Sequence, residues 1–353
     1  METIEQVQPS SFSQPFTKTT LTEVTDSLPR RPPCRVFFKN EYEQPSGSFK
    51  LRGIGNLIGR SIAKAESQGI SKNSMLVLAS SGGNAGLAAA YASEFYNVSC
   101  IVVLPTSAKA QISAKLKQYG AKTVIIGSNI NEADTYLKNV LMAEYQDKHI
   151  IYCHPFDNPL IWEGHASLIT ELSTQLDANE FNKLRSVVCS VGGGGLYNGL
   201  FKGLQQCKTK NTDLLLIETN QAPTMKETIR RGEIFTLDSV SSIATSLACS
   251  YLSPKSLDNF QNDSNIHTYL ESIDDLESIK PLVQFYNQTG VVVEPACGAA
   301  LSVVYDQLHL LEKNLTGLSK DDIVVIVVCG GSCTTLEELN SFKTVIARQE
   351  NKL

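Results

Sequence analysis

The sequence predicts an α/β protein of two domains, each with a twisted, mostly parallel sheet covered by helices. Its 353 residues are enough for roughly two domains of ordinary size. Continuous apolar runs, typical of strands buried on both faces, alternate along the chain with helical stretches. Two such series lie on either side of an irregular segment at 154–159, so we expect two sheets with a cleft between them.

The first series begins after a Ser/Gln/Pro/Thr-rich stretch, 1–18, that has no periodicity and is expected to form a loose arm. The patterns then predict strands at 35–39, 74–78, 99–104 and 123–126, and helices at 86–96, 108–119 and 133–145. Gly120 is placed to end the helix before it, because glycine readily adopts the left-handed conformation common at helix ends.

The second series follows the turn at 154–159. It predicts helices at 161–176 and 196–206, and strands at 186–190, 214–217 and 322–328. We expect residues 1–42 and 152–353 to form a large domain, and 43–151 to form a small domain. The last strand runs into Cys329-Gly330-Gly331-Ser332, at the edge where ligands of open α/β sheets gather.

Composition excludes several classes of protein. Hydrophobic residues make up 42% of the chain, charged residues 19%, and the net charge is −5, so non-specific nucleic-acid binding is not expected. No apolar run reaches the roughly 18 residues of a membrane-spanning helix. The acidic, polar start Met1-Glu2-Thr3 is unlike a targeting sequence, so no membrane partner and a cytoplasmic location are expected.

The nine cysteines are scattered and mostly in apolar surroundings. They have no Cys-x-x-Cys spacing, and the five histidines contain no His-Glu-x-x-His pattern. Neither a disulfide framework nor a zinc site is therefore indicated, and reduced, buried thiols are the better interpretation.

The strongest chemical signal is Ser190-Val191-Gly192-Gly193-Gly194-Gly195-Leu196, between a predicted strand and a predicted helix. Four consecutive glycines expose backbone N–H groups that can converge on a phosphate at a helix N-terminus. A flexible turn would need fewer glycines, and each has an entropic cost. A nucleotide site is the rival interpretation, but Gly-x-Gly-x-x-Gly and Gly-Lys-Ser/Thr are both absent. A phosphomonoester therefore fits better than a dinucleotide.

A second signal is the lysine in Pro45-Ser46-Gly47-Ser48-Phe49-Lys50-Leu51-Arg52-Gly53. Small residues allow close backbone approach, and Phe49 offers a flat surface beside the amine of Lys50. This arrangement suits a lysine that forms a Schiff base with an aldehyde cofactor. An exposed loop lysine is the plainer explanation for this segment taken alone.

Two further segments follow predicted strands. In Ala79-Ser80-Ser81-Gly82-Gly83-Asn84-Ala85-Gly86, the N–H groups and hydroxyls could hold a carboxylate, and Asn84 could bond a ring oxygen. A capped strand–helix turn explains this segment equally well. Cys329 could meet a ring nitrogen, or could simply be a buried thiol that ends a strand. A lysine beside an aromatic ring, a phosphate cradle and a ring-nitrogen partner together describe pyridoxal phosphate.

The chain resembles the pyridoxal-phosphate enzymes of fold type II, which have the tryptophan synthase β-like fold, and among them the catabolic L-serine/L-threonine dehydratases. The resemblance covers nearly the whole chain beyond residue 19. It is carried by the segments 44–53, 80–86, 154–167, 190–196, 294–300 and 329–332. This fold places the cofactor in the cleft between two domains and implies that the large domain, 1–42 and 152–353, binds it.

The resemblance implies a role for each matching residue. Lys50 would be the Schiff-base and catalytic lysine, Phe49 would pack on the cofactor ring, and Asn84 would bond its hydroxyl. Cys329 would face the ring nitrogen. The phosphate would be held by Gly192, Gly193, Gly194, Gly195 and Leu196. The substrate carboxylate would be held by Ser80, Ser81 and Gly82. A monovalent cation, potassium, would bind at Glu218, Ala222 and Leu247.

The implied activity is β-elimination from L-serine to pyruvate and ammonia, and from L-threonine to 2-oxobutyrate, in amino-acid catabolism or gluconeogenesis. The partner is then a small amino acid, and relatives are commonly homodimers. A serine racemase, a β-replacement synthase and a catalytically silent metabolite sensor remain alternatives. Two departures from the family pattern could alter pocket volume: Ser-Gly-Gly before Asn84, and Cys333-Thr334 after the last motif.

Overall fold

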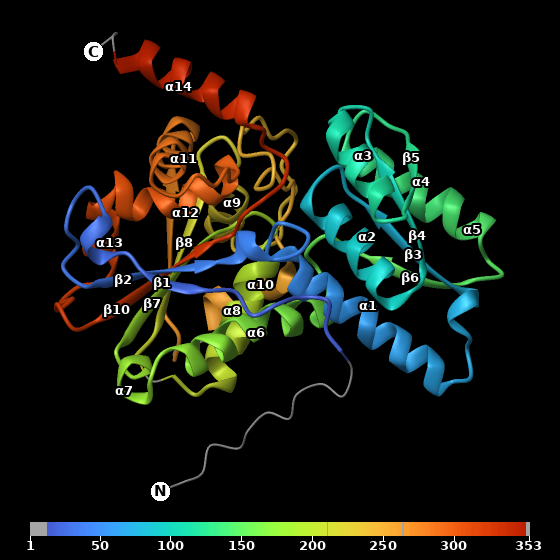
Figure 1. The fold of residues 1–353 in the computed structure, drawn as a ribbon, viewed down its shortest axis with the longest axis horizontal. Coiled ribbons are helices and arrows are strands. Elements are labelled where there is room, and N and C mark those ends of the chain that lie inside the picture. The colour runs from blue at the N-terminus through green and yellow to red at the C-terminus, as the bar shows by residue number, and fades with distance from the viewer. Residues whose placement is uncertain (1–12, 210, 263–264, 351–353) are drawn as a thin grey trace, which may run out of the picture.

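The computed structural model describes residues 13–209, 211–262 and 265–350 and contains two separate sheets with helices around each (Figure 1). This confirms the α/β class and the mostly parallel sheets. Most of the arm expected at 1–18 lies outside the described residues, and the remaining 13–18 form neither helix nor strand.

The larger sheet has six strands in the order β1-β2-β10-β7-β8-β9. Their bounds are β1 Leu21–Glu23, β2 Arg35–Asn40, β7 Leu184–Ser190, β8 Asp213–Thr219, β9 Thr268–Ile273 and β10 Ile323–Val328. Only the β1–β2 pair is antiparallel among the pairs described. Every residue of β10 is buried, as the predicted apolar strand at 322–328 requires for a central position covered on both faces.

The smaller sheet has four parallel strands in the order β5-β4-β3-β6. Their bounds are β3 Met75–Ser80, β4 Ser99–Leu104, β5 Lys122–Ile125 and β6 His149–Cys153. Alternate side chains of β3 enter different cores: Met75 and Val77 pack into one, and Leu76 and Leu78 into the other. The period-two geometry of a strand therefore explains why its apolar run is continuous.

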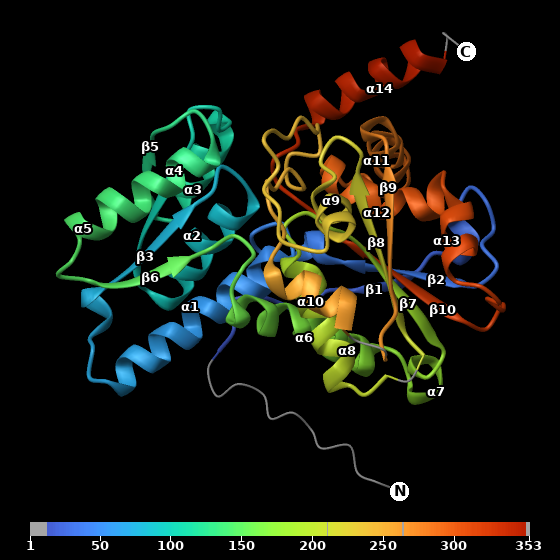
Figure 2. The same ribbon diagram turned by 180° about the vertical axis from the view of Figure 1, so that it is seen from behind.

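The described helices are α1 Lys50–Ser67, α2 Asn84–Tyr96, α3 Ala110–Gln118, α4 Ile130–Tyr136, α5 Met142–Glu144, α6 Pro159–Gln175, α7 Ala178–Phe181, α8 Gly195–Gln206, α9 Thr224–Arg231, α10 Pro254–Asn262, α11 Asp275–Thr289, α12 Pro295–Tyr305, α13 Leu308–Asn314 and α14 Leu336–Glu350. The larger sheet has α6, α8 and α10 on one side and α11, α12 and α13 on the other (Figures 1 and 2). Helix α1 runs outward from the junction and packs against both α2 and α6.

Most predicted elements are present with shifts of a few residues at their ends. The helix expected at 133–145 is instead α4 and α5, joined by the π-helical segment Leu137–Leu141. Gly120 has φ +71°, which confirms its helix-ending role after α3. Strand β6 pairs with β3 and extends past residue 151, and the division of the chain into domains at the predicted bounds stays a prediction.

A buried ion network fixes the first turn of α1. The Arg52 guanidinium donates to both carboxylate oxygens of Glu41, at 2.7 and 2.8 Å, and to both of Glu171, at 2.7 and 2.8 Å. The Lys39 amine, on β2, donates to Glu171 at 2.7 Å. Two cations thus face two anions, so α1 is tied to the larger sheet without a net buried charge.

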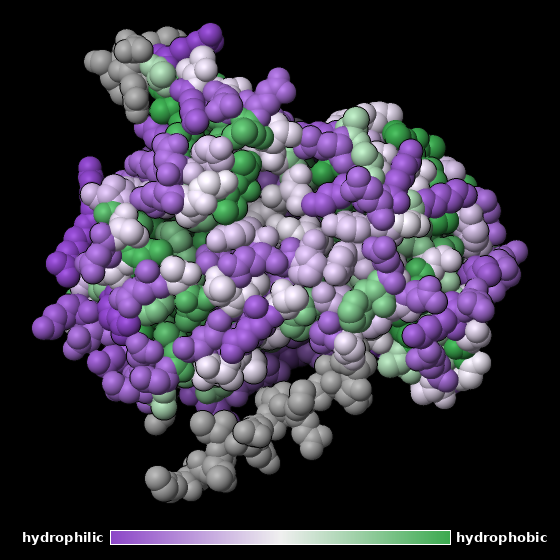
Figure 3. All heavy atoms as spheres, in the orientation of Figure 1, coloured by the Kyte–Doolittle hydropathy of each residue, from purple (hydrophilic) through white to green (hydrophobic). Residues whose placement is uncertain are grey.

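The face in Figure 3 is largely hydrophilic, with hydrophobic residues in smaller patches. Across the described helices, none combines the length and apolar character needed to cross a membrane. All nine cysteines are free thiols, and seven of them are buried, as the apolar surroundings of most of them predict.

Candidate active site

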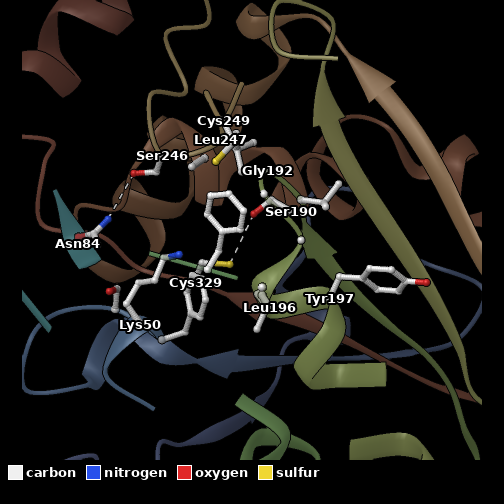
Figure 4. Close-up of a pocket in the computed structure, with 18 of the residues that line it drawn as sticks. Lys50, Asn84, Ser190, Gly192, Leu196, Tyr197, Ser246, Leu247, Cys249 and Cys329 are labelled. Atoms are coloured by element: carbon white, nitrogen blue, oxygen red, sulfur yellow. Dashed lines mark hydrogen bonds between the residues drawn. The ribbon is translucent and has the colours of Figure 1, made fainter. Parts of the chain in front are cut away.

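A pocket of about 570 Å³ lies where the carboxyl ends of β7 and β10 meet the start of α1, and part of this space is open to solvent. Such an edge is where open α/β sheets bind ligands. The pocket is lined by Ser48, Phe49, Lys50, Asn84, Phe156, Ser190, Val191, Gly192, Gly193, Gly194, Gly195, Leu196, Tyr197, Ser246, Leu247, Cys249, Glu294, Ala296, Cys329 and Gly330. Segments distant in sequence are therefore assembled around one cavity (Figure 4).

Lys50 is the first residue of α1, and backbone contacts hold it beside the end of β10. Phe49 N donates to the Cys329 carbonyl at 3.2 Å, and Ser48 forms an isolated bridge with Gly330. The Lys50 side chain is partly accessible on the pocket wall, and its amine donates to the Pro155 carbonyl at 2.8 Å. The segment carrying the lysine is thus docked onto the sheet edge rather than left as an exposed loop.

The electrostatic surroundings of Lys50 favour a neutral amine. Desolvation lowers its pKa, and interactions with Cys249, Cys329 and Glu294 offset this only in part. Among the residues that the structure describes, no carboxylate lies within ion-pair distance of the amine. A lysine of this kind can act as a nucleophile or as a base near neutral pH.

The glycine loop connects β7 to α8, which begins at Gly195. Gly194 has φ +87°, a conformation that disfavours other residues, and a Cβ there would lie 2.0 Å from the Ser256 hydroxyl oxygen. A Cβ on Gly193 would lie 2.6 Å from the Phe156 ring. Close packing therefore excludes side chains at these two positions, and the loop presents backbone to the pocket at the N-terminus of α8, which suits a phosphate.

Cys329 immediately follows β10, beside Ser190 at the end of the neighbouring strand. Its Sγ lies 3.6 Å from the Ser190 hydroxyl oxygen and 3.6 Å from the Val327 carbonyl oxygen. Burial raises the pKa of the Cys329 thiol to about 11. The thiol is therefore protonated at neutral pH and can meet a ring nitrogen as a weak, uncharged donor.

Asn84 is held at the start of α2 by the carboxylate of Glu294, which directly precedes α12. Its amide nitrogen donates to Glu294 at 2.8 Å, and its amide oxygen accepts from Ser332 N at 3.0 Å. The Ser246 hydroxyl also donates to Glu294. The side chain of Asn84 is thus fixed in orientation, with its second amide hydrogen directed near Ser246 (Figure 4).

The predicted carboxylate-binding residues are not among those that line the pocket. The Ser80 hydroxyl donates to Asp134 at 2.6 Å, and the Ser81 hydroxyl accepts from Gly83 N at 3.2 Å. The Ser81 hydroxyl can still donate its proton to a ligand, whereas the Ser80 hydroxyl already donates to Asp134 on α4. The assignment of Ser80, Ser81 and Gly82 to the substrate stays a prediction.

The predicted cation residues lie behind the glycine loop. Burial raises the pKa of Glu218 to about 7, although backbone N–H groups of Met225 and Lys226 bond its carboxyl. The Leu247 carbonyl would lie 2.9 Å from a Cβ on Gly192 and accepts from Cys249 N. Within the described part of the chain, no cluster of three His, Cys, Asp or Glu residues could hold a metal ion. A cation would therefore need backbone carbonyls, including that of Ala222.

Sequence reasoning assigned no role to several pocket residues, among them Phe156, Ser246, Cys249 and Glu294. Phe156 and Glu294 lie in segments that resemble the family, so the segments were recognised while the individual roles were not. Ser246 and Cys249 lie in the irregular stretch 233–253, which carries no periodic pattern. Only the folded chain brings that stretch against the glycine loop.

Comparison with known proteins agrees with this geometry. Residues 13–330 match the family described as "Pyridoxal-phosphate dependent enzyme". The chain is 40% identical over 318 residues to a catabolic L-serine/threonine dehydratase of Saccharomyces cerevisiae, covering 88% of this chain and 87% of that protein. It is 35% identical to the human L-serine dehydratase/L-threonine deaminase, with coverage of 87% and 89%.

Solved structures give the same fold. An L-serine ammonia-lyase from the fungus Rhizomucor miehei superposes with a TM-score of 0.82 at 30% identity, covering 94% of this chain and 99% of that one. A maize serine racemase superposes with a TM-score of 0.77 over 96% and 94% of the two chains, but at 22% identity. The second likeness concerns the fold alone.

Proposed function

The chain belongs to the family of pyridoxal-phosphate dependent enzymes, and on this premise we propose that it is an L-serine and L-threonine ammonia-lyase. It would convert L-serine to pyruvate and ammonia, and L-threonine to 2-oxobutyrate and ammonia. The observation that carries the proposal is the assembly of Lys50, the glycine cradle and Cys329 around one pocket. Relatives named as serine and threonine dehydratases, at 35% to 40% identity, support the substrate class.

The residues present fit the cofactor. Gly193 and Gly194 pack too closely against Phe156 and Ser256 for any side chain, so the loop presents backbone to the pocket, which suits the phosphate. The Lys50 amine lines the same pocket and is the partner that the cofactor's aldehyde requires. Phe49 would form a wall for the ring, Asn84 would bond the ring hydroxyl, and Cys329 would face the ring nitrogen. When bound, pyridoxal phosphate supplies an aldehyde for amines and a ring that withdraws electrons from the amino-acid Cα.

Lys50 would hold the cofactor and then take the Cα proton of the substrate. Its lowered pKa allows the neutral form to act as this base near neutral pH. Ser81 and the N–H of Gly82 would orient the substrate carboxylate, so that the Cα proton faces the amine. The neutral Cys329 thiol donates weakly, unlike a carboxylic partner that would hold the ring nitrogen cationic. This favours prompt loss of the β-hydroxyl over return of the proton to Cα.

A direct assay tests the proposal. The purified chain, saturated with pyridoxal phosphate, should release pyruvate from L-serine and 2-oxobutyrate from L-threonine, each in equal amount to ammonia. Lys50→Ala should release neither. Formation of D-serine faster than pyruvate would instead support a racemase, and absence of any product with normal cofactor absorbance would support a catalytically silent sensor.

We also propose a potassium site at Glu218, Ala222 and Leu247, a homodimer, and a catabolic or gluconeogenic role in the cytoplasm. The buried Glu218 carboxyl and the Leu247 carbonyl beside Gly192 support the cation site. The nine free cysteines support a reducing compartment. The resemblance to a family whose members are commonly dimers supports the assembly, which light scattering of the purified protein would test.

A further inference from the structure

The segment 154–158, between β6 and α6, lies between Lys50 and the glycine loop. Its Pro155 carbonyl accepts from the Lys50 amine at 2.8 Å. Its Phe156 ring would lie 2.6 Å from a Cβ on Gly193. The proposed mechanism uses both neighbours of this segment but gives the segment itself no role.

The His154 side chain closes the segment on itself. Its Nδ1 accepts from the backbone N–H of Asp157 at 2.8 Å and of Phe156 at 3.3 Å. A nitrogen that accepts twice carries no proton, so the hydrogen lies on Nε2, which donates to the Tyr251 hydroxyl at 2.8 Å. Burial lowers the pKa of His154 to about 4, so the ring stays neutral at neutral pH.

Other contacts make the segment rigid at its far end. The Trp162 indole N–H donates to the Phe156 carbonyl at 2.8 Å, and the Ser253 hydroxyl donates to Asp157 at 2.6 Å. The Pro155 carbonyl belongs to the same planar peptide group as the Phe156 N–H, so when this N–H points at the imidazole the carbonyl points the opposite way. Its direction is therefore set by the His154 contacts rather than by a strand or helix ladder.

A carbonyl acceptor has a specific effect on a lysine base. A neutral amine has two N–H bonds and one lone pair, and donation to the carbonyl fixes its rotation. The lone pair is then turned away from the carbonyl, and free rotation no longer spreads it over unproductive directions. Misplacement of a reacting group by about 1 Å can cost on the order of a hundredfold in rate.

We propose that His154 is a positioning residue, which aims the Pro155 carbonyl at the Lys50 amine so that the amine's lone pair faces the substrate Cα. The inference rests on the proposed function, since it assumes that Lys50 is the base. Tyr251 contacts the other nitrogen of the imidazole, which takes no part in holding the Phe156 and Asp157 N–H groups. His154 itself exchanges no proton in this role.

Charged and titratable groups surround both side chains. The Lys50 amine is influenced by Cys249, Cys329, Glu294, His154 and His165. The His154 ring is influenced by Asp157, Asp134, Lys138 and Lys50. Apart from His154, which is replaced by the uncharged side chains Asn and Gln, none of these residues is altered in the variants below, so a change at Lys50 can be attributed to the carbonyl.

Two substitutions of His154 distinguish the effect of its Nδ1 hydrogen bonds from the effect of its side-chain volume. Asparagine carries its oxygen where histidine carries Nδ1, so His154→Asn keeps an acceptor for the Phe156 and Asp157 N–H groups. His154→Gln places its polar atoms one bond further out and loses that acceptor. Tyr251→Phe removes only the partner of Nε2 and is the matched control for the opposite side of the ring.

The first measurement uses the cofactor-free chain and no catalysis. Acetylation of Lys50 at a series of pH values, followed by peptide mapping, gives the pH midpoint of its amine. The Pro155 carbonyl favours the protonated amine, so its displacement should lower this midpoint by about one pH unit in His154→Gln. His154→Asn and Tyr251→Phe should stay within about 0.3 units of the parent, a change too small to reflect a lost hydrogen bond.

The second measurement uses the enzyme saturated with cofactor. His154→Gln should lower kcat by about tenfold to a hundredfold with KM within about twofold, and His154→Asn should stay within about threefold of the parent kcat. If the Gln variant does not fold, His154→Ala gives the same comparison. Equal losses in the Asn and Gln variants, or a parental midpoint and kcat in the Gln variant, would overturn the inference. Parental activity in Lys50→Ala would overturn the proposed function instead.

Discussion

Lys50 and Arg52 lie two residues apart at the start of α1, and their surroundings could hardly differ more. Arg52 is fully buried between the carboxylates of Glu41 and Glu171, and its guanidinium contacts both oxygens of each. Lys50 faces the pocket, and its amine contacts only a backbone carbonyl among the described hydrogen bonds. The Arg52 guanidinium, with its anionic partners, therefore stabilises the fold, whereas the Lys50 amine, which lacks such partners, stays reactive.

The pKa values of the two side chains move in opposite directions. Burial alone would lower both, because it disfavours the charged form. For Arg52, Glu41 and Glu171 outweigh burial, so its pKa is raised. For Lys50 burial prevails, and its pKa is lowered. The chain therefore holds a permanent charge and a titratable amine within one helical turn.

The largest expected effect is on activity, in Lys50→Met. Methionine has a similar length but no amine, so the variant should lose at least about a thousandfold in pyruvate release. Its cofactor-free form should unfold at the parental temperature or above, because a desolvated amine has been removed. Pyruvate assays and thermal unfolding check both statements. Retained activity, or a strongly lowered unfolding temperature, would contradict the contrast with Arg52.

The next effect is on stability, in Arg52→Met. This change leaves Glu41 and Glu171 buried without their main partner and should lower the free energy of unfolding by about 3–5 kcal/mol. Arg60→Met, on the same helix, removes an exposed pair with Glu163 and should cost less than about 1 kcal/mol. Urea unfolding of the cofactor-free variants measures both. Equal losses would show that the buried network is no more important than a surface pair.

The free energy of unfolding should depend on pH differently at the Lys50 amine and at the Arg52 network. Between the lowered pKa of Lys50 and its ordinary value of 10.5, the unfolded chain binds a proton that the folded chain lacks. The free energy of unfolding should therefore rise with pH in this window, by at most about 1.4 kcal/mol per pH unit. Lys50→Met should lack this rise, as unfolding at about pH 7, 8, 9 and 10 would show.

The Arg52 network should respond in acid instead. Burial raises the pKa of Glu171, but Arg52 and Lys39 outweigh it, so the pKa is lowered from its ordinary 4.5. The stabilisation is then present above 4.5 and lost as the pH falls through the lowered value. The penalty of Arg52→Met should shrink over that range and stay constant from neutral to alkaline pH.

The two side chains also show what the sequence could predict. The four glycines and Cys329 were identified because they follow predicted strand ends, where α/β sheets place ligands. Lys50 was identified because small residues and the ring of Phe49 adjoin it. Arg52 and its partners were not, because Glu41 and Glu171 are 130 positions apart along the sequence. Nothing local in such a separation indicates that one guanidinium joins them.

Other features that the sequence analysis missed have different causes. Strand β6 carries His149-Ile150-Ile151-Tyr152-Cys153, an apolar and β-branched run that could have been recognised. The π-helical segment that divides the helix expected at 133–145 could not, because its sequence, Leu-Lys-Asn-Val-Leu, has ordinary helical composition. Ser246 and Cys249 reach the pocket only through the path of an irregular segment.

The smallest expected effect concerns Glu218, a buried carboxyl that forms no ion pair among the described residues. Burial raises its pKa to about 7, and a bound cation would favour the ionised form. Potassium should then stimulate activity by several-fold, and the half-saturating concentration should rise up to about tenfold for each pH unit below 7, because the proton and the cation compete.

Glu218→Gln keeps the shape of the side chain but not its charge, so it should flatten the response to potassium. Glu227→Gln, on helix α9, removes a carboxylate paired with Arg230 and should leave that response unchanged. The activity of both variants is measured at increasing potassium concentrations, with a bulky organic cation in place of potassium as the control. A full potassium response in Glu218→Gln would mean that this carboxyl, like Glu41, serves the fold rather than the site.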